Sequence, residues 1–186
     1  MQVLNIGVIV GSNSQKSINR KLAQALVQLV PADQAQFTFL DIQQLPLYSY
    51  DMDGTDAFAP FAAFKAEIAK CHGILFVTPE YNRSIPAALK NAIDAASRPY
   101  GQSAWGGLPA AVIGTSPGGA ATCMAQQHLR NVLANQDMTV MGQPEGFIQW
   151  NNELIDASGQ VGPKSKDFLT KYMTRFVQWV QKHPKG

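Results

Sequence analysis

Residues 11–19 read Gly-Ser-Asn-Ser-Gln-Lys-Ser-Ile-Asn and combine hydroxyl, amide and backbone N–H groups in one short segment. They follow an apolar run and precede a segment with helical periodicity, which places free backbone N–H groups at a helix N-terminus. The partial positive charge there attracts anions, and the hydroxyls of Ser12, Ser14 and Ser17 can complete the shell around a phosphate. The segment therefore predicts either a phosphate site or a plain helix cap at Ser17.

Glycine spacing narrows the class of phosphate ligand. No two glycines stand two residues apart, so the G-x-G-x-x-G motif of dinucleotide-binding folds is absent. No Gly-Lys-Ser or Gly-Lys-Thr occurs either, which excludes the usual nucleoside-triphosphate loop. A loop rich in hydroxyls and poor in glycine resembles the one that holds the phosphate of FMN in flavodoxin-like folds.

A second segment, residues 79–86, reads Pro-Glu-Tyr-Asn-Arg-Ser-Ile-Pro and follows the apolar run GILFVT. Its two prolines hold the chain in a fixed, non-helical path. Rigid backbone amides at Glu80 and Tyr81, together with the Asn82 side chain, suit the edge of a planar heterocycle, against which the Tyr81 ring packs. The alternatives are that Glu80 pairs with a neighbouring cation and that Tyr81 belongs to an oligomer interface.

A third segment, residues 114–118, fits the G-x-S-x-G motif of serine hydrolases. Asp156 and His183 even follow Ser116 in the order of the α/β-hydrolase triad. In that motif the N–H of the residue after the serine forms half of the oxyanion hole, and Pro117 has no N–H. Because losing one such donor costs on the order of 100- to 1,000-fold in rate, a hydrolase is disfavoured.

The three segments need a fold that brings them together. Apolar runs predict strands at 3–10, 37–42, 73–78, 110–114 and 138–141, the last with a continuation near 147–148. Helical periodicity predicts helices at 18–29, 61–68, 87–96, about 119–133 and 168–180. This alternation predicts an α/β fold: a doubly wound, five-stranded parallel sheet with helices on both faces, in a single domain spanning 1–186. Such sheets bind ligands beyond the carboxyl ends of their strands, where the three segments lie.

Composition excludes several classes of protein. Only 15% of the 186 residues are charged, with a net charge of +2, against an average of ~25%. The scarcity of charge suggests a surface covered by a partner or ligand, and the scattered Lys and Arg argue against a nucleic-acid partner. Two cysteines without C-x-x-C spacing and three histidines without H-x-x-x-H spacing predict free thiols and no metal site. No apolar run approaches ~18 residues, so we expect a cytoplasmic protein without membrane insertion.

Taken together, these motifs resemble the NAD(P)H-dependent FMN reductase family, whose flavodoxin-like members are described as quinone, azo-dye or chromate reductases. The resemblance rests on Gly11-Ser12, on residues 17–23, on residues 78–86 and on Leu89 to Asp94, in the family's order and spacing from residue 4 to about residue 146. It implies non-covalently bound FMN, NADPH or NADH as co-substrate, and a homodimer or a dimer of dimers with the flavin near the interface. We expect the loop at 43–56 to border the flavin of a neighbouring subunit.

The resemblance also implies the residues of the cofactor site. Ser12, Ser17, Ile18 and Asn19 would hold the phosphate, Pro79, Glu80, Tyr81 and Asn82 would hold the isoalloxazine, and Ser116, Pro117, Gly118 and Gly119 would line its other side; Ser14 belongs to the same site. Two residues depart from the family pattern, since Ser14 stands where the family often has Arg and Ala95 where it often has Trp. The coenzyme preference and the packing near the flavin are open for that reason.

The chemistry implied by the resemblance is carried by FMN, so we expect no catalytic side chain. Hydride passes from NAD(P)H to flavin N5 and then to a quinone-like, azo or other small-molecule electron acceptor, with ping-pong kinetics. The alternative is a flavodoxin-like electron carrier or sensor that binds FMN without oxidising NAD(P)H. Such carriers are usually strongly acidic, and a net charge of +2 argues against one.

Overall fold

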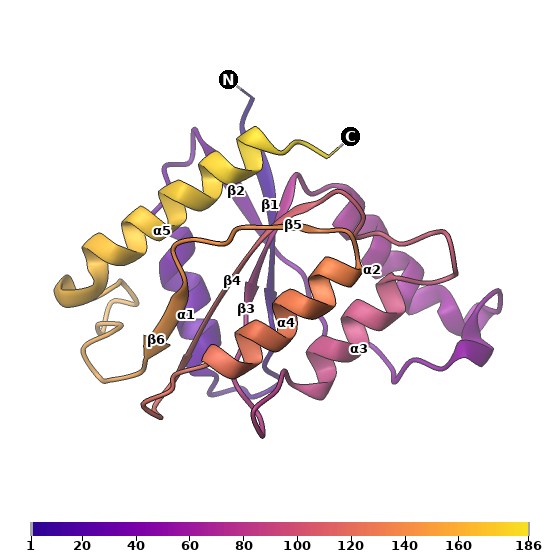
Figure 1. Ribbon diagram of the computed structural model, residues 1–186, viewed down its shortest axis with the longest axis horizontal. Coiled ribbons are helices and arrows are strands. Elements are labelled where there is room, and N and C mark those ends of the chain that lie inside the picture. Colours follow the sequence, from indigo (N-terminus) through magenta and orange to yellow (C-terminus); the bar gives the residue numbers. More distant parts are fainter. Residues whose placement is uncertain (1, 186) are drawn as a thin grey trace.

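Six parallel strands form one sheet at the centre of the molecule (Figure 1), whose computed structural model describes residues 2–185. The strands are β1 (Leu4–Val10), β2 (Ala35–Phe39), β3 (Gly73–Val77), β4 (Pro109–Ser116), β5 (Thr139–Val140) and β6 (Gly146–Gln149). Their order is β2-β1-β3-β4-β5, and β6 also pairs with β4. This is the strand order of flavodoxin-like doubly wound folds, which confirms the predicted fold class.

Helices cover both faces of the sheet (Figure 1). They are α1 (Ile18–Val27), α2 (Ala59–Ala69), α3 (Ala87–Ala96), α4 (Cys123–Asn135) and α5 (Pro163–Lys182). α1 and α5 pack on one face, whereas α2, α3 and α4 pack on the other. Successive strand residues alternate between these layers: Val8 lies in the first and Ile9 in the second. Within residues 2–185, no helix is long and apolar enough to cross a membrane.

The expected fifth strand is interrupted. β5 pairs with the beginning of β4, at Pro109 and Ala110, and β6 pairs with its end, from Ile113 to Ser116. Between the two pieces lies Pro144, which has no N–H to donate to a ladder. The continuation expected near 147–148 is therefore a separate strand along the same edge of β4.

Two other boundaries differ from the expectation. The second strand lies at 35–39 rather than 37–42, because the side chain of Asp41 accepts from Gln43 N (2.8 Å) and turns the chain away from the sheet. α4 begins at Cys123 rather than near Gly119, since Ala121 has a φ of 49°, outside the helical region.

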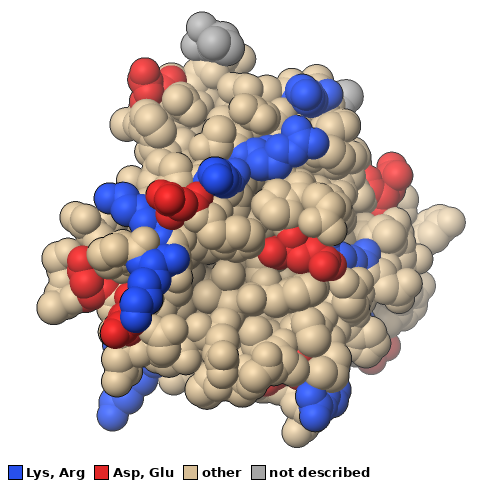
Figure 2. Space-filling view, turned by 60° about the vertical axis from the view of Figure 1, so that its left-hand side comes forward, with Lys and Arg blue, Asp and Glu red and all other residues tan. Residues whose placement is uncertain are grey.

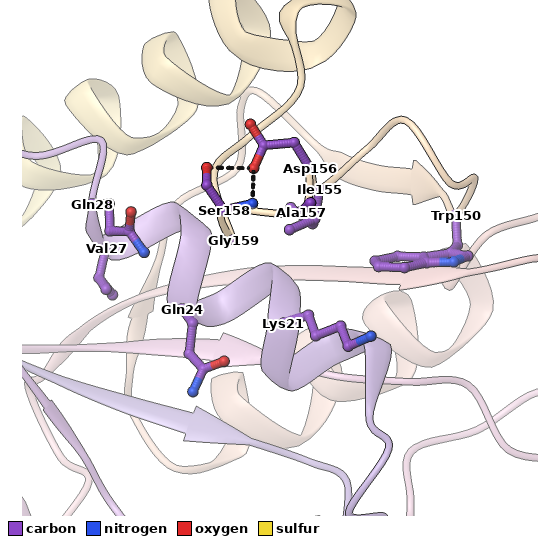
Figure 3. A pocket seen from close by; sticks show the side chains of 10 residues that line it. All are labelled: Lys21, Gln24, Val27, Gln28, Trp150, Ile155, Asp156, Ala157, Ser158 and Gly159. Atoms are coloured by element: carbon purple, nitrogen blue, oxygen red, sulfur yellow. Dashed lines mark hydrogen bonds between the residues drawn. The ribbon is translucent and has the colours of Figure 1, made fainter.

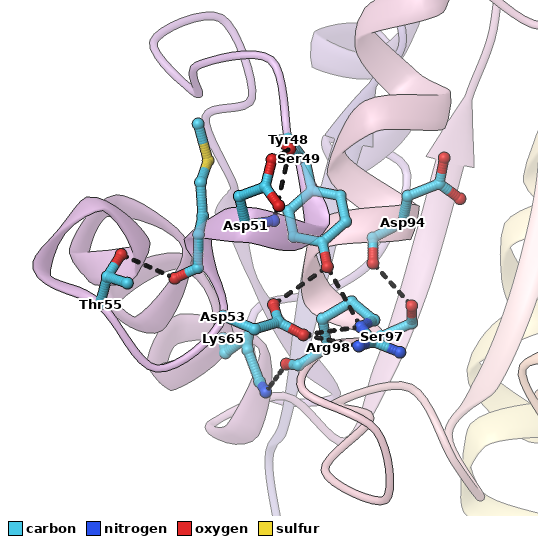
Figure 4. A network of polar contacts seen from close by, with 10 residues as sticks. Tyr48, Ser49, Asp51, Asp53, Thr55, Lys65, Asp94, Ser97 and Arg98 are labelled. Carbon is cyan, nitrogen blue, oxygen red and sulfur yellow. Dashed lines mark hydrogen bonds and ion pairs between the residues drawn. The ribbon is translucent and has the colours of Figure 1, made fainter.

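A polar network fixes the loop at 43–56 against the end of α3 (Figure 4). The Asp53 carboxylate accepts from the Tyr48 hydroxyl (3.0 Å) and pairs with the Arg98 guanidinium (2.6 Å). On the helix, the Asn91 amide accepts from Tyr48 N and donates to Pro46 O, both at 2.8 Å. The loop therefore holds a defined conformation, part of it as two short 3₁₀ helices at Tyr50–Met52 and Asp56–Phe58.

Charges on the surface are interspersed rather than grouped. In the face shown in Figure 2, Lys and Arg side chains alternate with Asp and Glu, and much of the centre carries neither. On α5, Lys164 pairs with Glu153 at 2.6 Å and Arg175 lies over the ring of Trp179. Two of the basic residues of this helix therefore have local partners.

The closing helix α5 is anchored to the centre of the sheet by one buried phenol. Tyr172 is fully buried, and its hydroxyl donates to Val112 O at 2.8 Å. Burial raises the pKa of Tyr172 above its ordinary value of 10.0, because the phenolate would lose its hydration.

We expect Tyr172→Phe to lower the free energy of unfolding by about 1 kcal/mol at neutral pH, because the Val112 carbonyl loses its partner. A group with a raised folded-state pKa stabilises fully below its unfolded pKa and loses that contribution as pH rises above it. The advantage of the native chain over the variant should therefore shrink above pH 10.0. Denaturant titrations at several pH values measure it, and a constant difference would contradict this role.

Candidate functional site

A cavity of about 260 Å³ opens at the carboxyl edge of the sheet, between the loops that follow β1, β3 and β4. These strands are hydrogen-bonded neighbours, so their ends lie side by side. The cavity is lined by Ser12, Ser14, Lys16, Ser17, Ile18, Asn19, Pro79, Glu80, Tyr81, Thr115, Ser116 and Pro117. Of the site residues that the sequence predicts, Asn82, Gly118 and Gly119 lie outside this lining.

The first loop presents the N-terminus of α1 to the cavity. Ser17 is the cap of this helix, and its hydroxyl accepts from Arg20 N at 3.1 Å, as the cap interpretation predicted. The backbone N–H groups of Ile18 and Asn19 have no acceptor within residues 2–185, and both residues line the cavity. The cap and the free donors therefore coexist, and the donors leave this end of the cavity attractive to an anion.

Lys16 supplies the positive charge of the first loop, where Ser14 replaces the arginine of the family pattern. Its backbone N–H donates to the Ser14 hydroxyl (3.2 Å), and its side chain lines the cavity. Arg20 lines a different cavity, beside Asp41. Lys16 was absent from the predicted site, although its position just before a helix N-terminus is a usable signal.

Asn19 fastens the first loop to the third. Its side chain is buried, donates to Thr115 O and accepts from Thr115 N, both at 2.9 Å. Both polar atoms of the amide are thus engaged within the protein, so Asn19 faces a ligand through its backbone only. Sequence reasoning had counted this amide among the groups available to a phosphate.

Thr115 carries a polar atom that its own fold leaves without a partner. The side chain is 1% exposed and lines the cavity, and its hydroxyl makes no hydrogen bond within residues 2–185. A buried hydroxyl without a partner costs about 1–3 kcal/mol, so a polar ligand atom in the cavity would relieve it. The site predicted from the sequence did not include Thr115, because the G-x-S-x-G motif singles out the adjacent Ser116.

Small residues let the strand ends approach closely. A Cβ on Gly114 would overlap the carbonyl oxygen of Thr78, so β4 can run beside the end of β3 only with glycine there. Beyond the strand, Gly118 N donates to the Ser116 hydroxyl at 3.3 Å and turns the loop away from the sheet. This turn carries Gly118 and Gly119 past the cavity.

The second loop is held by the carboxylate of Glu80. One of its oxygens accepts from the backbone N–H groups of Met124 and Ala125, both at 3.1 Å, and so caps α4. Its ion pair with Arg83 is longer, at 3.8 Å. The carboxylate therefore has a structural role, and Glu80 sits between the cavity and α4.

A tight turn follows immediately. Tyr81 and Ser84 exchange two backbone hydrogen bonds of 2.9 and 3.0 Å around Asn82 and Arg83, whose φ values are 52° and 66°. Two positive φ values define a type I′ turn, which asparagine tolerates well. Asn82 lies exposed in this turn and the Tyr81 side chain is 52% exposed, which leaves both beside the open cavity rather than beneath it.

The hydrolase triad does not form. The His183 ring packs on Trp179, whose indole N–H donates to Thr139 O at 2.8 Å. Thr139 pairs with Pro109 at the beginning of β4, whereas Ser116 ends that strand, roughly 20 Å away at ~3.3 Å per residue. The Asp156 carboxylate binds its own loop, at Ser158 and Gln160.

The sequence model of one family, described as NADPH-dependent FMN reductase, matches residues 4–151. The chain belongs to this family. The chain is 49% identical over 179 residues to a 2-hydroxy-1,4-benzoquinone reductase from a Burkholderia species, covering 96% of this chain and 97% of that protein. It is 42% identical over 180 residues to a quinone reductase from Pseudomonas putida, covering 97% and 96%.

The fold of the chain also matches a solved structure along nearly its whole length. The flavoenzyme FerB from Paracoccus denitrificans, an NAD(P)H:(acceptor) oxidoreductase, superposes with a TM-score of 0.91 at 41% identity, covering 98% of this chain and 100% of that one. These findings confirm the family predicted from the sequence, and with it an oxidoreductase that uses FMN and NAD(P)H.

We expect Asn19→Ala to destabilise the protein by about 2–3 kcal/mol, because the buried N–H and C=O groups of Thr115 lose their partners together. Thermal unfolding without added ligand measures this loss. Asn13→Ala is the matched control, since Asn13 is exposed in the same loop. Equal melting temperatures for the two variants would contradict the role of Asn19.

Proposed function

We propose that this protein transfers electrons from NAD(P)H to quinones, with FMN bound in the cavity at the strand ends. One observation supports the proposal most strongly: the N-terminus of α1, which attracts anions, and the rigid loops after β3 and β4 all line one cavity. Two relatives above 40% identity are named for quinone reduction, which supports this class of acceptor. When bound, FMN supplies the chemistry of accepting a hydride and passing two electrons on.

The residues at the first loop suit the phosphate of FMN. The free N–H groups of Ile18 and Asn19, the side chain of Lys16 and the hydroxyls of Ser12 and Ser17 all border one end of the cavity. Glu80 is the only carboxylate-bearing residue in the lining, and its charge is directed to the N-terminus of α4. The cavity therefore attracts an anion without placing a free negative charge beside it.

The other two loops suit the flavin ring. Residues 79–81 and 115–117 come from neighbouring strands and border the cavity from two sides. The Thr115 hydroxyl lies in this wall without a partner in the described residues, so a polar atom of the bound cofactor would satisfy it. Pro79 and Pro117 stiffen the two walls, so little chain entropy is lost on binding. Tyr81 stands at the open side, where a flat acceptor enters.

The site assignment predicts a specific effect of Thr115→Val. FMN affinity should fall about fivefold, or ~1 kcal/mol, because the cofactor loses one hydrogen bond in the cavity. Stability without FMN should not fall, since the variant removes a hydroxyl that has no partner in the protein. Fluorescence titration with FMN measures the affinity, and Thr174→Val, on the exposed side of α5, is the control. FMN binding that is unchanged in Thr115→Val would refute this wall of the site.

The proposed reaction predicts FMN-dependent consumption of NADPH or NADH when a benzoquinone is added. Initial rates at several quinone concentrations should give parallel double-reciprocal lines, because both substrates use the same space in turn. The absorbance of the reduced nicotinamide measures the rate. A protein that binds FMN but leaves NAD(P)H intact would instead be the electron carrier, which the net charge of +2 disfavours.

We also propose that the protein is a homodimer or a dimer of dimers. Leu47, Tyr50 and Tyr100 are 80%, 72% and 90% exposed, an unusual exposure for large apolar side chains. Tyr50 lies 4.9 Å from the Arg98 guanidinium, two residues before Tyr100, so these rings belong to one region. The loop at 43–56 would then border the flavin of the neighbouring subunit.

Light scattering on the purified protein tests the assembly, which should have at least twice the mass of the 20.2 kDa chain. Tyr100→Ser should shift the protein toward the monomer, because it removes apolar area from the proposed interface. A monomeric native protein would contradict the proposal.

A cytoplasmic location is part of the same proposal. Cys71 and Cys123 are both free thiols, which suits a reducing compartment. Burial raises the pKa of Cys71 to about 11, so this thiol stays protonated and unreactive at neutral pH.

A further inference from the structure

A second cavity, of about 660 Å³, lies between α1 and the segment 150–159 (Figure 3). It is lined by Lys21, Gln24, Val27, Gln28, Trp150, Ile155, Asp156, Ala157, Ser158 and Gly159. The predicted FMN site uses none of these residues. The proposed FMN site therefore does not explain this cavity.

Its walls combine an aromatic face, a cation and two amides. Trp150 is half-buried, and Figure 3 shows its flat ring on the side of the cavity toward which Lys21 extends from α1. Lys21 is exposed and forms no ion pair within residues 2–185, and the amides of Gln24 and Gln28 make no hydrogen bonds there. These side chains are thus free to bind a ligand.

Asp156, the acidic residue of the lining, is engaged in its own loop. One carboxylate oxygen accepts from Ser158 N (2.8 Å), the Ser158 hydroxyl (2.6 Å) and Gln160 N (3.0 Å). In Figure 3 the carboxylate lies on the far side of the cavity from Lys21 and Trp150. The loop at 156–160 therefore forms a defined rim, and the negative charge stays away from the cation.

Two backbone hydrogen bonds join residues that line this cavity to residues that line the first. Lys21 N donates to Ser17 O, so the Lys21 residue stands about one helical turn after the cap of the first loop. Trp150 N donates to Ser116 O at 2.9 Å, so the backbone of Trp150, just after β6, lies beside the end of β4. Residues that line the second cavity therefore lie next to residues that line the first.

We propose that the second cavity binds the adenosine phosphate half of a dinucleotide. The purine stacks on the Trp150 ring, as bases stack on aromatic side chains elsewhere. The Lys21 ammonium binds a phosphate oxygen, and the Gln24 or Gln28 amide pairs with the adenine edge, whose N6 donates and N7 accepts. The inference rests on the proposed function, because it completes a site for NAD(P)H or for FAD in place of FMN.

The direct test is binding of ADP to the FMN-loaded protein, measured by calorimetry. ADP should bind, and Lys21→Gln and Trp150→Leu should each weaken its binding about tenfold, as expected from losing a charged hydrogen bond or one stacked base. Trp150→Phe should retain most of the affinity, because the stacking surface remains. Lys182→Gln, an exposed lysine near the end of α5, is the charge-matched control and should bind ADP as the native protein does.

Two further measurements identify the source of the adenosine. The first compares kcat/KM for NADH with kcat/KM for reduced nicotinamide mononucleotide, which lacks adenosine. If the adenosine belongs to NAD(P)H, both variants should lower the ratio of the first value to the second about tenfold. If it belongs to FAD, the variants should instead weaken the affinity of the apoprotein for FAD relative to FMN. Either result supports the subsite.

The subsite and the proposed function can be contradicted independently of each other. ADP that does not bind, or that binds equally to both variants, overturns the subsite even if NAD(P)H is oxidised. ADP binding that depends on Lys21 and Trp150 supports the subsite even in a protein that does not reduce quinones.

Discussion

Two hydrogen bonds between the Asn19 amide and the backbone of Thr115 hold the candidate site together. β1 and β4 are not neighbours, because β3 lies between them, so pairing in the sheet does not by itself join their loops. Asn19 spans that distance and fixes the N-terminus of α1 against the end of β4. The anion end of the cavity and its Thr115 wall therefore keep a constant separation, which a ligand with a phosphate at one end requires.

The central fold could be predicted because its signal is strong at each position. A strand such as Gly73–Val77 is buried on both faces, and its unbroken apolar run distinguishes it from an exposed strand. Once the strands are parallel and adjacent, their loops must meet at one edge, so the location of the site follows without any knowledge of the side-chain contacts. The motif at 79–86 then identified the family.

The details that could not be predicted depend on partners far away in the sequence. A neighbouring cation was the alternative partner for Glu80, and Arg83 does lie 3.8 Å away, but the N–H groups that its carboxylate binds come from α4, more than forty residues later. The Thr115 hydroxyl has no partner because Asn19, 96 positions earlier, hydrogen-bonds only the backbone N–H and C=O groups of that residue. Ala95, in place of a family Trp, packs beside Phe58 and Phe61, whose rings lie 5.4 Å apart. No pattern of neighbouring residues in the sequence predicts such long-range contacts.

The account places FMN in the cavity between the three loops, and a crystal structure of the FMN-loaded protein tests this most directly. The account predicts the phosphate within hydrogen-bonding distance of the Ile18 and Asn19 N–H groups. It also predicts the ring between residues 79–81 and 115–117, with the Thr115 hydroxyl bonded to the cofactor. A flavin bound anywhere else, or one that leaves the Thr115 hydroxyl without a partner, would contradict it.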